Sequence, residues 1–207
     1  IAHPIIRAVF DKFNLNTPVE LTSFGSEING AGMGGSSSFS NALISSILRY
    51  QGVTANREEI AEYSCDIEIN RLKKPIGKQD QYLTSLGGFR FLKFMPNGKV
   101  ENIYEFSEKE NLDFEKYVDS LVLVKMDMNR SASSVLENIK RDKEKSSEEI
   151  KYIRDNASIY LEHLKNKNCF DSKLLDELIN ESWERKRALP GVLNDALEIA
   201  EKKLKEM

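Results

Sequence analysis

The sequence predicts an α+β fold, because an antiparallel hairpin pattern and extended helical periodicity occur in the same chain. Residues 89–94 and 100–106 read as paired strands, with Asn97 and Gly98 at the turn between them. From residue 131 onward nearly all of the chain has helical period. Helices beside an antiparallel strand pair are typical of the α+β class.

The first half of the chain is expected to hold short elements separated by turn residues. We predict helices at residues 4–13, 56–70 and 80–86 and a short strand at residues 19–24. Asn56 followed by Glu59 is a capping-box signature for the second helix. Gly87 and Gly88 would stop the third helix.

The composition changes after about residue 107, and the second half is expected to be one strand with a helical array. Residues 120–128 (SLVLVKMDM) are predicted as a buried strand. Helices are predicted at residues 132–145, 147–165, 171–188 and 194–206. The chain is therefore expected to divide into domains at 1–107 and 108–207.

Composition excludes several classes of protein. With 40% hydrophobic and 30% charged residues, the 207-residue chain is typical of a soluble globular protein. A net charge of −3 argues against a nucleic-acid partner. The two histidines exclude a histidine-rich metal site, and no apolar run has the length of a membrane span. Cys65 and Cys169 stand outside any C-x-x-C pair, which predicts reduced thiols and a cytoplasmic location.

The start of the chain predicts processing or truncation. Its first residue is Ile1, and IAHPIIRAVFDKF begins directly with an amphipathic helical pattern. We therefore expect the N-terminus to be trimmed relative to a complete protein.

The most informative segment is NGAGMGGSSSFS at residues 29–40, which leads directly into an amphipathic helix. The apolar stripe of that helix consists of Phe39, Leu43, Ile44, Ile47 and Leu48. A glycine-rich turn at a helix N-terminus presents unpaired N–H groups to an anion, most often phosphate. A flexible linker is the alternative interpretation. No Walker A motif occurs in the chain, and the serine hydroxyls could ligate Mg²⁺.

Two carboxylates downstream complete a candidate site. Asp80 follows a glycine at the start of a predicted helix, where a carboxylate can accept a proton from an attacking hydroxyl or hold it in position. Glu68, on the preceding helix, is a candidate second metal ligand. Taken singly, Asp80 could be a helix N-cap and Glu68 a surface carboxylate.

These motifs together resemble the GHMP kinases. GAGMGGSSSF is similar to the second motif of that family, P-x-x-x-G-L-G-S-S-A, and GKQDQY resembles the segment that carries its catalytic aspartate. IEINRLKKPIGKQDQYLTSLGGFRFLKF, NRSAS and ESWERKRAL resemble segments of the branch that acts on D-glycero-D-manno-heptose 7-phosphate. The resemblance covers nearly the whole chain.

The resemblance implies a role for each matching residue. Asp80 would be the catalytic carboxylate, and Ser36, Ser37 and Glu68 would hold Mg²⁺. The phosphates of ATP would be wrapped by Gly30, Ala31, Gly32, Met33, Gly34, Gly35, Ser36, Ser37 and Ser38. Substrate contacts are expected from Gly87, Gly88, Arg130, Lys186 and Arg187.

The implied fold is a two-lobed GHMP kinase fold, present here in part, with an ATP-binding lobe at 1–107 and a C-terminal lobe at 108–207. The implied activity is ATP-dependent phosphorylation of a sugar or sugar phosphate, with the C1 hydroxyl of the heptose 7-phosphate as acceptor. The first and third family motifs, including the basic partner of Asp80, are expected outside this chain. A kinase for another small metabolite, or an inactive fragment that binds a nucleotide or a partner, are the alternatives. The oligomeric state is not predicted.

Overall fold

The computed structural model describes residues 1–25, 32–124 and 132–206. Contacts divide the chain into two compact units, Ile1–Gly88 and Phe89–Met207. Each unit has a hydrophobic core of its own. The two units are therefore described separately.

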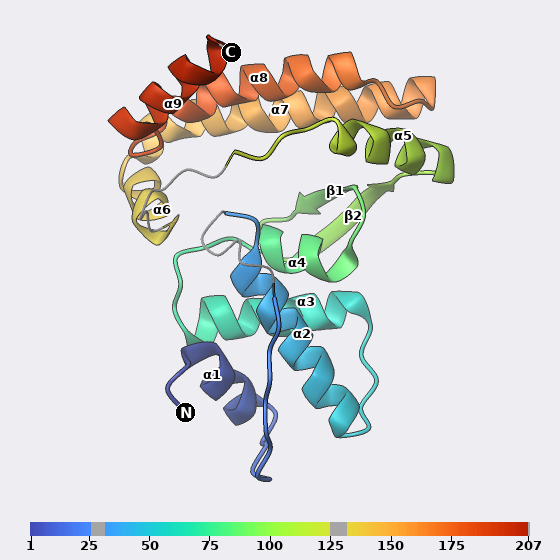
Figure 1. Ribbon diagram of the computed structural model, residues 1–207, viewed down its shortest axis with the longest axis vertical. Helices are drawn as coiled ribbons and strands as arrows, with labels where there is room; N and C mark the ends of the chain where they lie inside the picture. The colour runs from blue at the N-terminus through green and yellow to red at the C-terminus, as the bar shows by residue number, and fades with distance from the viewer. Residues whose placement is uncertain (26–31, 125–131, 207) are drawn as a thin grey trace. The chain divides into compact units, whose positions relative to one another are not determined.

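The first unit is helical throughout its described elements. It consists of α1 (Pro4–Lys12), α2 (Gly35–Tyr50), α3 (Arg57–Cys65), the π-helical segment η1 (Asp66–Arg71) and α4 (Gln79–Leu86). Helix α2 packs against α1, α3 and α4 (Figure 1). Three helices of the unit are thereby positioned relative to α2, and η1 packs against α1 and α3.

The apolar stripe of α2 forms the centre of the core in the first unit. Leu43, Ile44, Ile47 and Leu48 are all buried, and Ile44 is fully enclosed. Their i, i+3 and i+4 spacing places them on one face of the helix, which α1 and η1 cover. The predicted amphipathic helix after the glycine loop is confirmed.

Helix α3 begins with the predicted capping box. The Asn56 side chain accepts a hydrogen bond from the Glu59 N–H at 2.8 Å, and Glu59 accepts from the Asn56 N–H at 2.7 Å. Two otherwise unpaired donors are satisfied in this way. Two of the other predicted helices of this unit, 4–13 and 80–86, are also confirmed, within one residue at each end.

The second unit combines a hairpin with helices. Its elements are β1 (Arg90–Phe94), β2 (Val100–Glu105), α5 (Glu108–Asp119), α6 (Ala132–Arg141), α7 (Lys143–Lys167), α8 (Ser172–Arg187) and α9 (Asp195–Lys205). The strands pair antiparallel, as the turn at Asn97–Gly98 predicted. The pairing has an irregularity between Phe91 and Leu92, which was not predicted. Helices α7 and α8 run side by side (Figure 1). This mixture of helices with an antiparallel pair confirms the α+β class.

An aromatic cluster forms the core of the second unit. Phe106, Tyr160 and Leu164 are buried at its centre, with Phe89 and Phe170 packed against them. The Tyr160 hydroxyl donates to the Asp171 carbonyl at 3.1 Å, so its polar end is satisfied where the chain turns between α7 and α8.

Two predicted strands are wrong in their described parts. Residues 19–24 lie outside any strand, and Phe24 is 93% exposed. Residues 121–124 are likewise outside any strand, and Val122 is 85% exposed. The rest of that predicted strand, residues 125–128, lies outside the described residues. A strand needs a hydrogen-bonded neighbour, and β1 and β2 pair with each other in the sheet that the described residues form.

Helix α5 was missed, although its signal is present in the sequence. Ser107 and Glu110 form a capping box, in which the Ser107 side chain accepts from the Glu110 N–H. The pattern S-x-x-E before a helical period is a known start signal.

The predicted helix break near residue 146 is also wrong, because α6 ends at Arg141 and α7 begins at Lys143. No helix within the described ranges is long and apolar enough to cross a membrane.

Candidate active site

The described part of the glycine-serine segment turns directly into α2. Gly32 and Gly34 have positive φ values of 70° and 68°, a backbone conformation that glycine adopts without strain. The Gly34 carbonyl accepts the first helical hydrogen bond, from the Ser38 N–H at 2.9 Å. No side chain in the described ranges caps this helix, so its first N–H groups can bind an anion. Gly30 and Ala31 lie outside the described residues.

Gly34 lies directly against α4. A β-carbon added at Gly34 would lie 3.2 Å from Cγ2 of Thr84 and 3.6 Å from Cβ of Asp80. The absence of a side chain at Gly34 therefore permits this close approach. The structure thus brings the described end of the loop beside the predicted catalytic carboxylate.

Two helices hold α4 in this position. The Asn41 amide of α2 donates to the Gln81 carbonyl at 2.9 Å and to Thr84 Oγ1 at 2.8 Å. From α3, the Glu62 carboxylate accepts hydrogen bonds from Lys78 Nζ at 2.8 Å and from the Tyr82 hydroxyl. These bonds fix the N-terminal turn of α4, where Asp80 lies.

Asp80 is exposed at the second position of α4, and Lys78 is the N-cap residue. The interpretation of Asp80 as an N-cap is therefore wrong. The Asp80 carboxylate makes no hydrogen bond or ion pair within the described residues, whereas its backbone carbonyl accepts from Thr84 Oγ1 at 2.6 Å. Its oxygens are accordingly accessible to a ligand beside the loop.

Glu68 is fully buried, so its interpretation as a surface carboxylate is also wrong. Its Oε2 accepts from Ser36 Oγ at 2.7 Å and from Lys74 Nζ at 2.6 Å. Its Oε1 accepts from Ser37 Oγ at 3.0 Å and from Gln81 Nε2 at 3.1 Å. The three residues predicted as metal ligands therefore lie in direct contact with one another.

The partners of Glu68 keep its carboxylate charged. Burial raises its pKa, but hydrogen bonds from Lys74 and Ser36 and the charge of Lys74 outweigh burial and lower the pKa below its ordinary value. A buried carboxylate without such partners would become neutral instead. Glu68 is thus an anionic group with hard oxygen atoms inside the unit.

The π-helical segment η1 that carries Glu68 is anchored at its start by Asp66. Lys12 of α1 donates to Asp66 Oδ2 at 2.7 Å, and Arg71 donates to the same oxygen at 3.1 Å. The hydrogen bond from Lys12 is the main reason that the pKa of Asp66 falls to about 2. Extra turns of π-helix often occur at functional sites, because they change which residues face a neighbouring element.

A buried acceptor beside Glu68 lacks a hydrogen-bond partner. Gln81 is fully buried, and its Oε1 has no partner in the described residues, although its Nε2 donates to Glu68. Unpaired buried acceptors are rare, and a cation or a donor on a ligand would satisfy this one. Together with Glu68 and two serine hydroxyls, Gln81 Oε1 makes a set of candidate metal ligands that are all oxygen atoms, which Mg²⁺ prefers.

The described ranges hold no cluster of three or more histidine, cysteine, aspartate or glutamate side chains suited to a metal ion. A metal at Glu68 would therefore take other oxygen ligands from serine hydroxyls and a bound substrate. Nearby Cys65 is no candidate nucleophile, because burial raises the pKa of its thiol to about 12.

The predicted substrate residues belong to different parts of the chain. Gly87 is the C-cap of α4 and Gly88 follows it, both with φ of 67°, so they end the helix as predicted. Lys186 and Arg187 belong to α8 in the second unit. Arg187 is paired with Glu201 of α9 at 3.2 Å, a contact that joins two helices. Arg130 lies outside the described residues.

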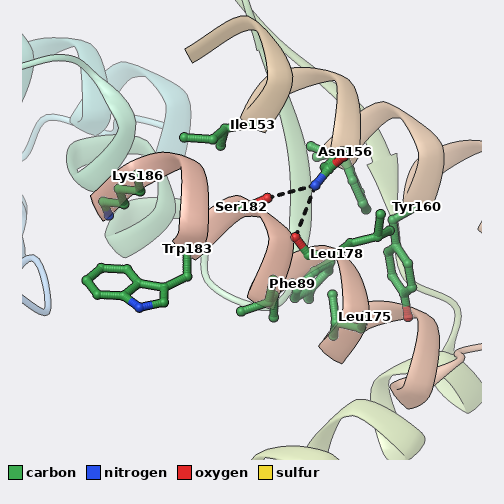
Figure 2. A pocket seen from close by; sticks show the side chains of 12 residues that line it. Phe89, Ile153, Asn156, Tyr160, Leu175, Leu178, Ser182, Trp183 and Lys186 are labelled. Carbon is green, nitrogen blue, oxygen red and sulfur yellow. Dashed lines mark hydrogen bonds between the residues drawn. The ribbon is translucent and has the colours of Figure 1, made fainter. Parts of the chain in front are cut away.

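The second unit contains a cavity of about 410 Å³, and Lys186 lies at its edge. Figure 2 shows that Asn156 of α7 bonds to Ser182 and to the Leu178 carbonyl of α8 inside this cavity. The remaining wall is largely apolar and aromatic, including Phe89, Tyr160 and Trp183.

The sequence did not identify Lys74, Gln81 and Asn41 as parts of the site. Lys74 and Gln81 stand in the segment KKPIGKQDQY, which supplied Asp80, so this segment was the available signal. Asn41 stands in the predicted helix after the loop, where nothing in the pattern marks it as a contact of α4.

Comparison with known proteins agrees with the motifs. Residues 1–88 match the family described as GHMP kinases N terminal domain. Over 190 residues the chain is 29% identical to the D-glycero-alpha-D-manno-heptose 7-phosphate kinase of Campylobacter jejuni, covering 90% of this chain and 52% of that protein. The chain thus spans about half the length of this curated relative. No solved structure matches the chain significantly. The resemblance to the GHMP kinases is confirmed by these findings.

Proposed function

We propose, taking residues 1–88 as a GHMP kinase N-terminal domain, that the protein is an ATP-dependent kinase with a sugar hydroxyl as acceptor. The observation that carries this proposal is that the end of the glycine loop, the Asp80 carboxylate and the hydrogen-bonded cluster of Ser36, Ser37 and Glu68 all lie at the start of α2. Gly34 lies against Asp80, and Ser36 and Ser37 both bond to the buried Glu68. Phosphoryl transfer mainly requires positioning and charge neutralisation. The end of the loop and Asp80 are suited to positioning, and Ser36, Ser37 and Glu68 are suited to holding the Mg²⁺ that would neutralise phosphate charge.

In the proposed reaction, the first turn of α2 binds the phosphates of ATP through backbone N–H groups. Ser36, Ser37 and Glu68 would hold Mg²⁺, which supplies positive charge against the phosphate oxygens. Gln81 Oε1 offers a further oxygen beside Glu68. The binding of ATP and Mg²⁺ is part of this proposal.

Asp80 would act on the acceptor. Its exposed carboxylate lies beside Gly34, so a hydroxyl bonded to it is held close to the end of the loop. The hydroxyl oxygen forms a bond to the γ-phosphorus as the bond to the ADP oxygen breaks, and the hydroxyl proton passes to Asp80. The acceptor we propose is the C1 hydroxyl of a heptose 7-phosphate, in keeping with the name of the relative.

The two-lobed fold of the family, with its boundary near residue 107, also remains a proposal. The first of the two compact units of this chain ends at Gly88, where the match to the N-terminal domain also ends. Lys186 remains a candidate for the substrate phosphate, because its ammonium is exposed at the edge of the cavity in the second unit.

The test is ADP release by the full-length protein over a panel of sugar phosphates. We expect Asp80→Asn to lower kcat about 10²- to 10⁴-fold. Since the carboxylate is exposed and unpaired within the described residues, the melting temperature should not change. Glu58→Gln, which neutralises an exposed carboxylate in the first turn of α3, is the matched control and should retain full activity. Wild-type turnover by Asp80→Asn would remove Asp80 from the mechanism.

A further inference from the structure

Lys74 makes the shortest described contact with the buried carboxylate of Glu68. Its Nζ lies 2.6 Å from Glu68 Oε2, and its side chain is 30% exposed, whereas that of Glu68 is fully buried. The other described partners of the carboxylate, from Ser36, Ser37 and Gln81, are neutral donors. Lys74 is therefore the partly exposed residue whose ammonium supplies the positive charge beside this buried carboxylate.

The backbone of Lys74 is fixed independently of its side chain. Its N–H donates to the carbonyl of Glu68 at 3.0 Å, so the residue is tied to η1 through the main chain. Lys73 before it has a positive φ of 53°, which turns the chain back toward η1. The ammonium stands at the end of a flexible four-carbon stem. It can move into solvent without breaking the backbone contact.

An ammonium and a divalent cation would bind the same carboxylate oxygen of Glu68, and either can balance its charge. A buried carboxylate is costly unless a positive charge accompanies it. Mg²⁺ binds oxygen at 2.0–2.1 Å, and the ammonium already lies 2.6 Å from Oε2. Two cations on one buried oxygen repel each other strongly in a medium of low dielectric constant. Binding of one should therefore displace the other.

We infer that Lys74 is an internal counter-cation of the Glu68 site, which balances the negative charge of the carboxylate before the metal binds and moves into solvent when the metal arrives. The inference rests on the proposed metal binding at Glu68. It gives Lys74 a positioning role: it keeps Glu68 charged and in place while lowering the apparent affinity for metal. Premature metal binding without the nucleotide is thereby disfavoured.

The first experiment replaces the ammonium with an apolar group of similar length in the full-length protein. We expect Lys74→Met to tighten binding of Mn²⁺ alone about tenfold, because the competing cation is gone. The free Mn²⁺ concentration is measured by its electron paramagnetic resonance signal. In EDTA the melting temperature should fall by about 5 °C, because Glu68 loses its counter-charge. Lys73→Met is the matched control and should change neither value, since Lys73 is exposed and its ammonium makes no hydrogen bond or ion pair within the described residues.

A second measurement tests the wild-type protein and does not require Lys74→Met to fold. Lysines are dimethylated with ¹³C-formaldehyde and observed by NMR. The methyl signal of Lys74 is assigned from its loss in Lys74→Arg. Addition of MgCl₂ should move this signal toward that of exposed lysines and leave the Lys73 signal unchanged. A Lys74 signal that stays in place as the metal binds would overturn the inference.

Glu68→Gln separates the two proposals. Equal Mn²⁺ binding by wild type and Glu68→Gln would contradict the metal site itself. If Glu68→Gln loses the metal and Lys74→Met binds it with wild-type affinity, the metal site stands and the role of Lys74 is refuted. Tighter binding by Lys74→Met, with loss of binding by Glu68→Gln, supports both.

Discussion

Gly34→Ala tests whether the loop and Asp80 depend on one close backbone contact. The added methyl group would stand at a φ of 68° and 3.2 Å from Thr84 Cγ2. The positive φ alone costs a non-glycine residue about 1–2 kcal/mol. The contact adds to this cost, because Thr84 is held by its bonds to Asn41 and to the Asp80 carbonyl. Relief therefore requires α4 to shift.

Gly35→Ala is the matched control, one residue along the chain. A β-carbon at Gly35 meets nothing within 4 Å, and this residue begins α2 without a positive φ. Both variants restrict the unfolded chain equally, and that effect stabilises by about 0.4–1 kcal/mol. The free energies of unfolding of the two variants should therefore differ by about 2 kcal/mol, with Gly34→Ala the less stable.

Urea unfolding and steady-state kinetics measure the two consequences. A displacement of Asp80 by about 1 Å would lower kcat by about 10²-fold in Gly34→Ala. Gly35→Ala should lose much less activity, because it keeps the backbone N–H through which the first turn of α2 would bind phosphate. Adding Thr84→Ser removes the methyl group at 3.2 Å and should recover part of the loss, while the cost of the positive φ remains. Equal stability and activity of the two alanine variants would refute the argument that Gly34 positions Asp80.

Two further predictions concern charge and capping. Because the pKa of Glu68 lies below its ordinary value in the folded protein, its contribution stabilises the fold above the unfolded pKa of about 4.3 and is lost as pH falls through the folded pKa. The free energy of unfolding should thus fall less steeply below pH 4.3 in Glu68→Gln than in wild type, and parallel curves would contradict the assigned shift. Ser107→Ala should cost about 1 kcal/mol, because the α5 capping box with Glu110 is lost. Chemical denaturation measures it against Ser158→Ala, an exposed mid-helix site that should change little.

Elements with a local signal were predicted well from sequence. The apolar stripe lies within α2 itself. The capping box at Asn56 begins α3, and the turn at Asn97–Gly98 connects β1 directly to β2. The predicted strands at residues 19–24 and 120–128 failed in their described parts because a strand also needs a partner. Apolar composition alone supplies no such neighbour.

The candidate site shows the same division. The sequence identified the glycine loop, Asp80, Ser36, Ser37 and Glu68 as separate motifs. It gave no reason to assign Lys74 to Glu68, although the two are six residues apart, because the pairing depends on the turn after η1. Nor did it indicate that Gln81 of α4 donates a hydrogen bond to Glu68, since that contact joins residues thirteen positions apart.

The sequence by itself determined which chemical groups are present and which helix or turn carries each, because capping, periodicity and glycine conformation act over a few residues. Only the tertiary structure decided that Glu68 is a fully buried anion with a lysine counter-charge. It also decided that the end of the loop lies against Asp80. Burial and electrostatic pairing depend on the packing of α2 against α3 and α4, and these contacts join residues that are distant along the chain.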